Sequence, residues 1–231
     1  EELRRAVAEG GKLSTLAFSE SGSRSHFWMP VSTAERTADG FKLNAKKQLI
    51  TSAGQADLFV WSSRPAEREG LSSIWAVPAG SAGLTMGPAF EGLGYRGNCS
   101  SPLVATDVTV SASAGLGEDG KGFEVMMGTV MPFFSILNAS VSLGMMEGVF
   151  SRTVQHVTST KYSYDDSPLA ALPQVRGHVA RMKVKIDMVG CFLLDAVDAI
   201  ESSREDAMVR VLEAKAVGSE SSLEVHDLAM R

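Results

Sequence analysis

The sequence predicts an α+β protein: an antiparallel, barrel-like β domain in the middle of the chain, followed by a bundle of long helices. Two textures predict it. Between Leu13 and about Ala112, glycine, serine and proline separate short runs rich in β-branched and aromatic residues. After Gly122, apolar residues recur at helical spacing over long stretches. The expected domains are residues 1–12, the end of a preceding helical domain, then 13–115, the β domain, and 116–231, an incomplete helical bundle.

The first residues carry helix signals. Leu3, Ala6 and Val7 follow helical spacing, and Gly10-Gly11 comes directly after them. Glycine is common just past the end of a helix because it accepts the left-handed conformation found there. Residues 1–12 therefore read as the end of a helix.

Short β runs follow one another at a spacing of roughly 8–15 residues, which is typical of an antiparallel barrel or sandwich. Asp39-Gly40 lies between two of them and predicts a hairpin, since this dipeptide readily supplies the positive φ angles of a tight turn. The runs are LSTLAFSE, HFWMPVSTAER, FKLNAKKQLIT, DLFVWSS, SSIWAVPA and LVATDVTV.

The helical part begins with a long apolar segment from Phe123 to about Thr160. A helix of about 38 residues would be about 57 Å long. Pro132 should kink or interrupt it, because proline lacks an amide hydrogen and clashes with the preceding turn. Small residues on this segment would let neighbouring helices approach closely; they are Ala139, Ser140, Ser142 and Gly144.

Two further helices are expected. A loop over 161–173 leads into a helix at about 174–202, whose apolar side includes Met182, Ile186 and Val189. Ser203, with Asp206 three residues later, is predicted to cap a third helix that runs to residue 231. Long helices with broad apolar faces indicate a bundle.

Composition narrows the class of protein. The 231 residues are 44% apolar and 21% charged, with a net charge of −5, as expected for a cytoplasmic protein. This charge gives no electrostatic case for binding nucleic acid or an anionic membrane. No run approaches the length of a transmembrane helix, and the first residues lack the apolar core of a signal peptide. Cys99 and Cys191 read as free thiols, and the four scattered histidines predict no metal site.

Several segments, taken in order, resemble the acyl-CoA dehydrogenase family. LAFSESGSRS at 16–25 is similar to its Thr-Glu-Pro-Gly-Ala-Gly-Ser-Asp stretch, and residues 40–61 to its Gly-Lys-x-Trp-Ile-Thr-Asn-Ala segment. Residues 93–101, 107–110 and 117–123 resemble the Leu-Gly-x-Arg, Asp-Val-x-Val and Gly-x-Gly-Phe succession. Residues 138–148 resemble the family's helix rich in small residues, and residues 213–231 resemble a later helical segment of the family. The resemblance implies the acyl-CoA dehydrogenase fold in a partial chain that lacks most of the N-terminal helical domain and the C-terminal end.

The resemblance also implies a flavin, FAD with FMN as the alternative. It places Phe18 and Ser19 at the pyrimidine edge of the flavin and Thr51 near its N5 atom. Leu49 stands where the family has a tryptophan, so the wall of the site would be aliphatic. Lys161 falls near residues that contact the flavin nucleotide of a neighbouring subunit. Read from the residues alone, Ser19 and Thr51 are strand residues that bond locally, and only the resemblance favours a flavin contact.

The substrate side is less complete. The resemblance gives Ser25 a contact with an acyl-CoA, and Arg24 is either a phosphate ligand or an exposed loop residue; His26 would lie in the same cleft. The catalytic base is unknown, because the expected glutamate is not present in this chain. In a minority of the family it lies on the first long helix, just before an arginine, and Phe134 and Ser135 stand at these two positions here. Glu20 is expected to be structural.

Three functions stay open. The first is α,β-dehydrogenation of an acyl-CoA thioester with hydride transfer to flavin N5, with electron-transfer flavoprotein as a partner. The second is a flavin-dependent monooxygenase of the same fold, favoured by the missing carboxylate. The third is a non-catalytic paralogue. The resemblance further implies a homodimer or homotetramer, whose contacts would cover the apolar helical faces.

Overall fold

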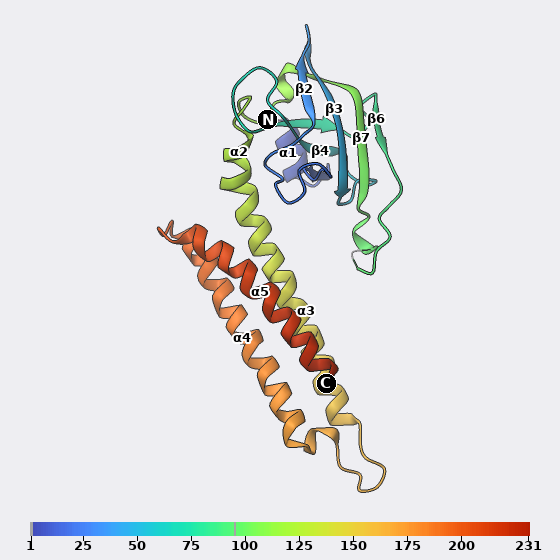
Figure 1. Ribbon diagram of the computed structural model, residues 1–231, viewed down its shortest axis with the longest axis vertical. Coiled ribbons are helices and arrows are strands. Elements are labelled where there is room, and N and C mark those ends of the chain that lie inside the picture. Colours follow the sequence, from blue (N-terminus) through green and yellow to red (C-terminus); the bar gives the residue numbers. More distant parts are fainter. Residues whose placement is uncertain (1, 95) are drawn as a thin grey trace. The chain divides into compact units, whose positions relative to one another are not determined.

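The structure, a computed structural model, describes residues 2–94 and 96–231. The chain divides into two compact units and passes from one to the other between Met127 and Gly128 (Figure 1). Two parts of the sequence predictions lie outside the described residues: position 1 of the first segment and position 95 of the 93–101 motif. The domain boundary expected at 115 stays a prediction.

In the described residues, the first unit holds two β-sheets and the short helix α1, and it ends within the helix that begins with α2 (Gly122–Val125). The three-stranded sheet has the order β1-β4-β5, and the four-stranded sheet has the order β2-β3-β7-β6. All neighbouring strands are antiparallel except β1 and β4, which are parallel. The elements are α1 (Glu2–Ala8), β1 (Ser14–Ala17), β2 (Thr33–Arg36), β3 (Gly40–Ile50), β4 (Leu58–Ser63), β5 (Ser73–Pro78), β6 (Leu84–Met86), the 3-10 turns Arg96–Asn98 and Ala112–Ala114, and β7 (Ser101–Ser111).

The hairpin predicted at Asp39-Gly40 is confirmed. Strands β2 and β3 pair antiparallel, and the amide of Thr37 donates to the carbonyl of Gly40 at 2.9 Å. Gly40 also faces β7 so closely that a Cβ atom there would lie 2.0 Å from the carbonyl oxygen of Val110. Only glycine fits this start of β3.

Two details of the β prediction are wrong. Only residues 33–36 of the run HFWMPVSTAER form a strand, and the preceding residues form turns. The amides of Val31 and Ser32 donate to the carboxylate of Glu20, so they are not available to a strand ladder. Strand β6, Leu84–Met86, was not anticipated, since three residues flanked by glycines carry little periodicity.

The core of the first unit is formed by the inward faces of the strands. Trp61 and Trp75 are buried at its centre, and the ring of Phe41 packs on Trp75 at 4.5 Å between centroids. On β3, Phe41, Leu43 and Lys47 are buried, whereas Lys42 and Asn44 are half-buried and Lys46 is exposed, as expected for a strand with one face on a core. Other fully buried members are Leu43, Ile50, Phe59, Leu103 and Val108.

The predicted long helices are confirmed. The first runs through α2 (Gly122–Val125), a π-helical turn (Met126–Val130) and α3 (Met131–Ser159). Pro132 directly follows the π-turn, so the interruption expected from its missing amide hydrogen appears as a local change of helix type and not as a break in the helix. The 3-10 turn Leu169–Ala171 precedes α4 (Pro173–Glu201), and α5 (Ala207–Met230) ends the unit.

The predicted cap of the third helix is wrong. Asp206, not Ser203, is the N-cap residue of α5, and it makes no side-chain capping bond. The guanidinium of Arg204 donates hydrogen bonds to both carboxylate oxygens of Asp206, and the guanidinium of Arg210 donates a further one to the same carboxylate. Ser203 itself has a φ of 54°. The ion pairs therefore replace the capping box.

The three long helices pack closely along one another. Met146 of α3, Met182 and Ile186 of α4, and Val225 of α5 share one buried cluster. Gly218 of α5 lies against Ala139 of α3, so that a Cβ on the glycine would be 3.3 Å from the alanine Cα and Cβ. The predicted close approach at a small residue of this helix is thus confirmed for Ala139.

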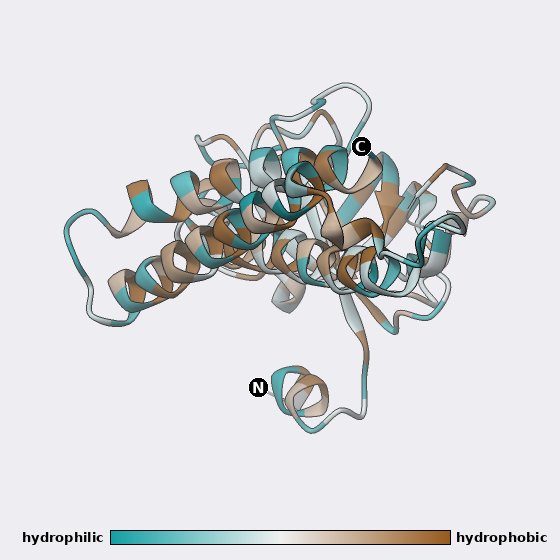
Figure 2. Ribbon diagram, turned by 90° about the horizontal axis from the view of Figure 1, so that it is seen from below, coloured by the Kyte–Doolittle hydropathy of each residue, from teal (hydrophilic) through white to brown (hydrophobic). Residues whose placement is uncertain are grey.

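Hydrophobic residues recur along the helices, as the brown stretches of the ribbon in Figure 2 show, and several large apolar side chains of the helical unit are exposed. The helix Gly122–Ser159 is long and apolar enough to span a membrane by length and composition, with a mean hydropathy of 1.4, and 17% of that window is buried. A core helix passes the same test, so this is weak evidence for a membrane. Exposed residues on α3 are Phe133, Phe134, Leu137, Val141 and Met145.

Candidate functional site

The four flavin-edge positions predicted in the first unit come from two neighbouring segments. Phe18 and Ser19 directly follow β1, while Leu49 and Thr51 lie at the end of β3. The amide of Gln48 donates to the carbonyl of Ser19 at 2.9 Å, which holds the segments side by side. The fold therefore brings these predicted residues into one region, although β1 and β3 belong to different sheets.

The side chains of Ser19, Leu49 and Thr51, which together form an edge of the first unit, are accessible to a ligand. Ser19 and Thr51 are exposed, and within the described chain neither hydroxyl forms a hydrogen bond with another residue. The reading in which these hydroxyls serve local strand bonds therefore has no support in the structure. Leu49 is 55% exposed, whereas Phe18 is buried beneath the edge. The edge offers two hydroxyls and an aliphatic surface.

A β-bulge lies at the end of β3, where Leu49 and Thr51 are exposed. The register with β7 shifts between Lys47 and Ile50, and Leu49 has a φ of 54°. Leucine pays for positive φ by about 1–2 kcal/mol, because its Cβ approaches the following carbonyl. Such strain persists where surrounding contacts fix it, and it clusters at functional sites.

A buried ion pair lies directly beneath the edge. The Lys47 ammonium is 2.5 Å from Oε1 of Glu20, with side-chain exposures of 0% and 1%. Burial lowers the pKa of Lys47 to about 8, although Glu20 opposes this. Burial alone would raise the pKa of Glu20, but attraction by Lys47 and hydrogen bonds from Lys47, Ser32 and Val31 outweigh it, and the pKa of Glu20 is lowered. The structural role expected for Glu20 stays a prediction that this geometry supports.

The sequence reasoning missed Lys47, although a signal was present. Phe41, Leu43 and Lys47 share the parity of the inward face of β3, whereas the adjacent Lys46 is exposed. A lysine on the apolar parity of a strand needs a partner, because a buried ammonium is costly unless paired. The parity indicates that a partner is needed, but it does not identify Glu20, which lies 27 positions away.

A cavity of about 720 Å³ lies next to the turn that follows Glu20. Its basic residues are His26, Arg64 and Arg68, and Met29 and Leu71 give it apolar wall. The other lining residues are Gly22, Ser23, Pro30, Val31, Pro65, Glu69 and Gly70. The cavity combines cationic donors with apolar surface, which suits an anionic group carried on an organic chain.

The predicted substrate residues fall beside this cavity rather than in its wall. Arg24 and Ser25 are exposed and belong to the same turn, but they are not among the residues that line it. Arg24 has a φ of 48°. His26, which was named as a cleft residue, does line it. Arg64 and Arg68 come from the loop after β4, and nothing in their spacing distinguishes them from other exposed arginines.

The arginine-bearing wall is held by a carboxylate. Asp119 accepts the amide hydrogens of Ala66, Glu67 and Arg68 at 3.0, 2.9 and 2.9 Å. It also accepts the hydroxyl of Ser73 at 2.5 Å. Burial raises the pKa of Asp119, but these hydrogen bonds outweigh it and leave the pKa below its ordinary value. The loop therefore has a fixed backbone at its arginines.

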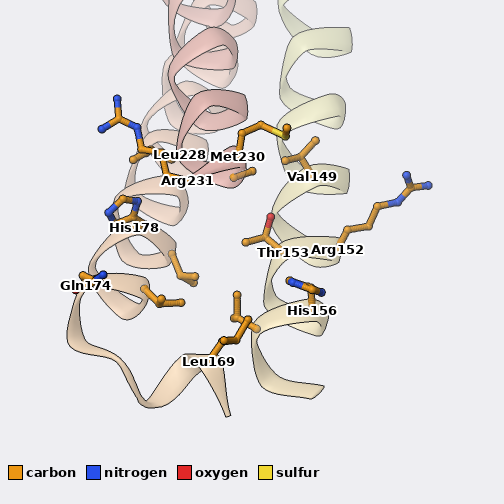
Figure 3. A pocket seen from close by; sticks show the side chains of 14 residues that line it. Val149, Arg152, Thr153, His156, Leu169, Gln174, His178, Leu228, Met230 and Arg231 are labelled. Atoms are coloured by element: carbon orange, nitrogen blue, oxygen red, sulfur yellow. The ribbon is translucent and has the colours of Figure 1, made fainter. Parts of the chain in front are cut away.

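The helical unit has its own cavity, of about 570 Å³, between the ends of α3, α4 and α5. His156 of α3 and His178 of α4 lie on opposite sides of it, with Thr153 between them (Figure 3). Among the described residues no group of three histidines, cysteines or acidic residues could hold a metal. Lys161, the remaining predicted cofactor residue, lies in this unit outside the cavity and pairs with Asp166 at 2.7 Å. Its cofactor role stays a prediction.

The described chain offers no clear catalytic base at either predicted position. Phe134 is 56% exposed and Ser135 is 2% exposed on α3, and neither side chain accepts a proton near neutral pH. Glu20, the carboxylate nearest the candidate edge in the chain, is held by Lys47. No residue is therefore assigned to proton removal.

Comparison with known proteins covers both units. The family model described as the acyl-CoA dehydrogenase middle domain matches residues 15–108, and the model for the acyl-CoA dehydrogenase C-terminal domain matches residues 120–231. Cyclohex-1-ene-1-carbonyl-CoA dehydrogenase of Syntrophus aciditrophicus (strain SB) is 26% identical over 93% of this chain and 53% of its own length. Human mitochondrial short-chain specific acyl-CoA dehydrogenase is 29% identical over 77% of this chain and 43% of its own. The chain spans about half the length of these relatives.

Solved structures give the same fold. Butyryl-CoA dehydrogenase from Megasphaera elsdenii superposes with a TM-score of 0.89 at 25% identity, covering 97% of this chain and 58% of that one. A structure of PigA with FAD and proline has a TM-score of 0.90 at 19% identity, covering 100% of this chain and 61% of that one. At 19% identity the second likeness concerns the fold alone.

Proposed function

The chain belongs to the acyl-CoA dehydrogenase family, and from this we propose that it is part of a flavin-dependent oxidoreductase that forms the α,β double bond of an acyl-CoA thioester. The observation that carries the proposal is the edge formed by Ser19, Leu49 and Thr51. Two exposed, unbonded hydroxyls flank an exposed aliphatic side chain on segments tied together by hydrogen bonding. An isoalloxazine ring needs this combination of donors and apolar surface.

The residues present fit a flavin by the chemistry of their donors, and we propose FAD, with FMN second. Thr51 and Ser19 would donate to polar atoms of the ring, and Leu49 would cover its face. When bound, the flavin accepts a hydride from the substrate at N5. Phe18, buried under the edge, would hold the shape of the site. Lys161 would contact the flavin nucleotide of a second subunit.

The cavity beside the edge is the proposed place for the thioester carrier. Arg64 and Arg68 present guanidinium groups, which match phosphate oxygens geometrically, and His26 adds a third donor. Arg24 and Ser25 would contact the same ligand from the adjacent turn. We assign no residue of this chain as the catalytic base.

Further proposals concern assembly and location. The exposed apolar face of α3 would be covered by a second copy in a homodimer or homotetramer, because surfaces of this kind are rarely left open. Electron-transfer flavoprotein would reoxidise the flavin. The unpaired, exposed thiols of Cys99 and Cys191 fit a reducing compartment, and we place the protein in the cytoplasm.

A flavin-dependent monooxygenase is the second candidate. It is favoured by α3, where Phe134 stands at the position that holds a carboxylate in part of the family and Ser135 at the position of the arginine that follows it. An oxygenase needs no carboxylate there to remove an α-proton. A non-catalytic paralogue would lack both activities.

Anaerobic titration with short-, medium- and long-chain acyl-CoA thioesters tests the first proposal. Bleaching of the oxidised flavin band, with formation of the 2-enoyl product, is the expected result. Flavin that stays oxidised with every thioester overturns it. Reduced flavin that consumes O2 only with a non-thioester substrate supports the monooxygenase. Purified protein that binds no flavin at all excludes both enzymes.

A further inference from the structure

We infer that Lys47 and Glu20 are positioning residues for the edge formed by Ser19, Leu49 and Thr51. The ion pair holds the end of β1 against the end of β3, so that the hydroxyls of Ser19 and Thr51 can contact the same bound flavin. The inference rests on the proposed function. Neither charged side chain is exposed, so neither touches the ligand itself. Their effect would be transmitted through the two segments that carry the hydroxyls.

The pair joins four stretches of chain through directed hydrogen bonds. Lys47 Nζ donates to Oε1 of Glu20 at 2.5 Å, and to the carbonyl and hydroxyl oxygens of Ser62 at 2.7 and 3.0 Å. The Glu20 carboxylate in turn accepts the amides of Val31 and Ser32 at 2.7 and 3.1 Å, and the Ser32 hydroxyl at 2.6 Å. Every donor of the ammonium and both oxygens of the carboxylate are used.

These bonds connect the two sheets at the edge. Lys47 lies on β3 of the four-stranded sheet, whereas Ser62 lies on β4 of the three-stranded sheet and Glu20 follows β1 of the same sheet. The Trp61 ring lies 5.1 Å from the ammonium and closes the other side. Charged hydrogen bonds constrain both distance and direction, so the tie fixes the spacing of the sheets more narrowly than apolar contact does.

The tie also fixes where β3 bulges. Lys47 is paired in register with Leu103, and the register shifts immediately after it. Leu49, two residues on, holds a positive φ that leucine adopts only where neighbouring contacts impose it. Because the Lys47 side chain is held in the interior, the shift in strand register falls on the residues that follow it. Thr51 is then exposed to solvent.

The test separates positioning from mere stability. Lys47→Met is compared with Lys46→Met, which removes the exposed neighbouring charge from the same strand. FAD affinity and the visible spectrum of bound FAD are measured at a temperature at which circular dichroism shows the variant fully folded. We expect about tenfold weaker FAD binding and an altered flavin spectrum for Lys47→Met, partial recovery of both in Lys47→Arg, and wild-type values for Lys46→Met.

A folded Lys47→Met protein that binds FAD with wild-type affinity and spectrum would overturn the inference while leaving the proposed function intact. Wild-type protein that binds no FAD overturns both. If Lys47→Met does not fold, Ser32→Ala replaces it, since this change keeps both buried charges and removes only the Ser32 hydroxyl, which bonds Oε1 of Glu20 at 2.6 Å and lies 3.0 Å from the Ser62 carbonyl oxygen. We then expect FAD affinity to fall about threefold or more, and an unchanged affinity and spectrum in folded Ser32→Ala would overturn the inference.

Discussion

The ammonium of Lys47 lies 2.5 Å from a carboxylate oxygen of Glu20, and both side chains are shielded from solvent. Removing two charges from water is costly, and their attraction repays that cost only when further hydrogen bonds satisfy them. Here Ser32, Ser62 and the amide of Val31 supply those bonds. The pair is therefore stable as a unit and vulnerable to the loss of either member.

Replacing Lys47 alone should destabilise the first unit strongly. In Lys47→Met the Glu20 carboxylate stays buried without its counter-ion, and we expect a loss of about 3–5 kcal/mol in the free energy of unfolding. Urea denaturation followed by tryptophan fluorescence measures it, since Trp61 and Trp75 are both buried in this unit. Lys46→Met, at an exposed position, should change stability by less than about 0.5 kcal/mol. A loss equal to that of the control would show that the pair contributes nothing.

The decrease in the free energy of unfolding at acidic pH should depend on Glu20. Its pKa in the folded protein is lower than its ordinary value of 4.5. The unfolded chain therefore binds more protons as the pH falls through this range, and stability must fall with it. The contribution is complete above about pH 5 and is lost below the lowered pKa. Denaturation between about pH 6 and pH 3 should show a shallower pH slope in Glu20→Gln, and an identical slope contradicts the assignment.

The β domain illustrates what the sequence carries locally. Asp39-Gly40 predicted the β2–β3 hairpin because turn chemistry and close packing on Val110 both select glycine there. The segment 26–32 was misread as strand because its aromatic residues have strand propensity. Its amides instead serve Glu20, a contact between residues distant in sequence. Propensity cannot report such a contact.

The positions of the candidate cofactor residues could be predicted from the sequence, but the buried ion pair that holds their segments together could not. Ser19 and Thr51 were found by resemblance, and the structure brings their segments together. The pairing of Lys47 with Glu20 spans 27 positions and depends on the sheets meeting. Ser203 failed as a cap for a related reason, since Arg204 engages Asp206 together with Asp195 of the preceding helix. In both cases the pairing of charged side chains, which residue spacing does not report, decided the outcome.

Asp119 should control the loop that carries the two cavity arginines. Asp119→Ala leaves the amides of Ala66, Glu67 and Arg68 without their acceptor, and we expect a loss of about 1–3 kcal/mol. Hydrogen exchange at these amides should accelerate more than elsewhere in the unit. Glu118→Ala is the matched control, because it removes only an exposed ion pair with Arg68. Unchanged exchange in Asp119→Ala would contradict this role.

The α3–α5 contact gives a prediction for the helical unit. Gly218→Leu would force a side chain against Ala139, where even a Cβ lies 3.3 Å from its neighbours, and overpacking of this kind costs about 1–3 kcal/mol. Gly148→Ala on α3 meets nothing within 4 Å and should stabilise by about 0.5–1 kcal/mol, because alanine favours the helix. Thermal melting of both variants checks the pair. Equal effects in the same direction would mean that the helices do not meet at Gly218.

Thr51 provides the most direct test of the flavin edge. Its hydroxyl is exposed and bonds no described residue, so Thr51→Val should leave the free energy of unfolding nearly unchanged. If the hydroxyl donates to the flavin, the same change removes one hydrogen bond worth about 1 kcal/mol and weakens FAD binding about fivefold. Thr37→Val, at the β2–β3 turn away from the edge, serves as the control. Because stability and affinity are predicted to separate, a fall in both together would indicate that Thr51 supports the strand rather than the ligand, and a fall in neither would remove it from the site.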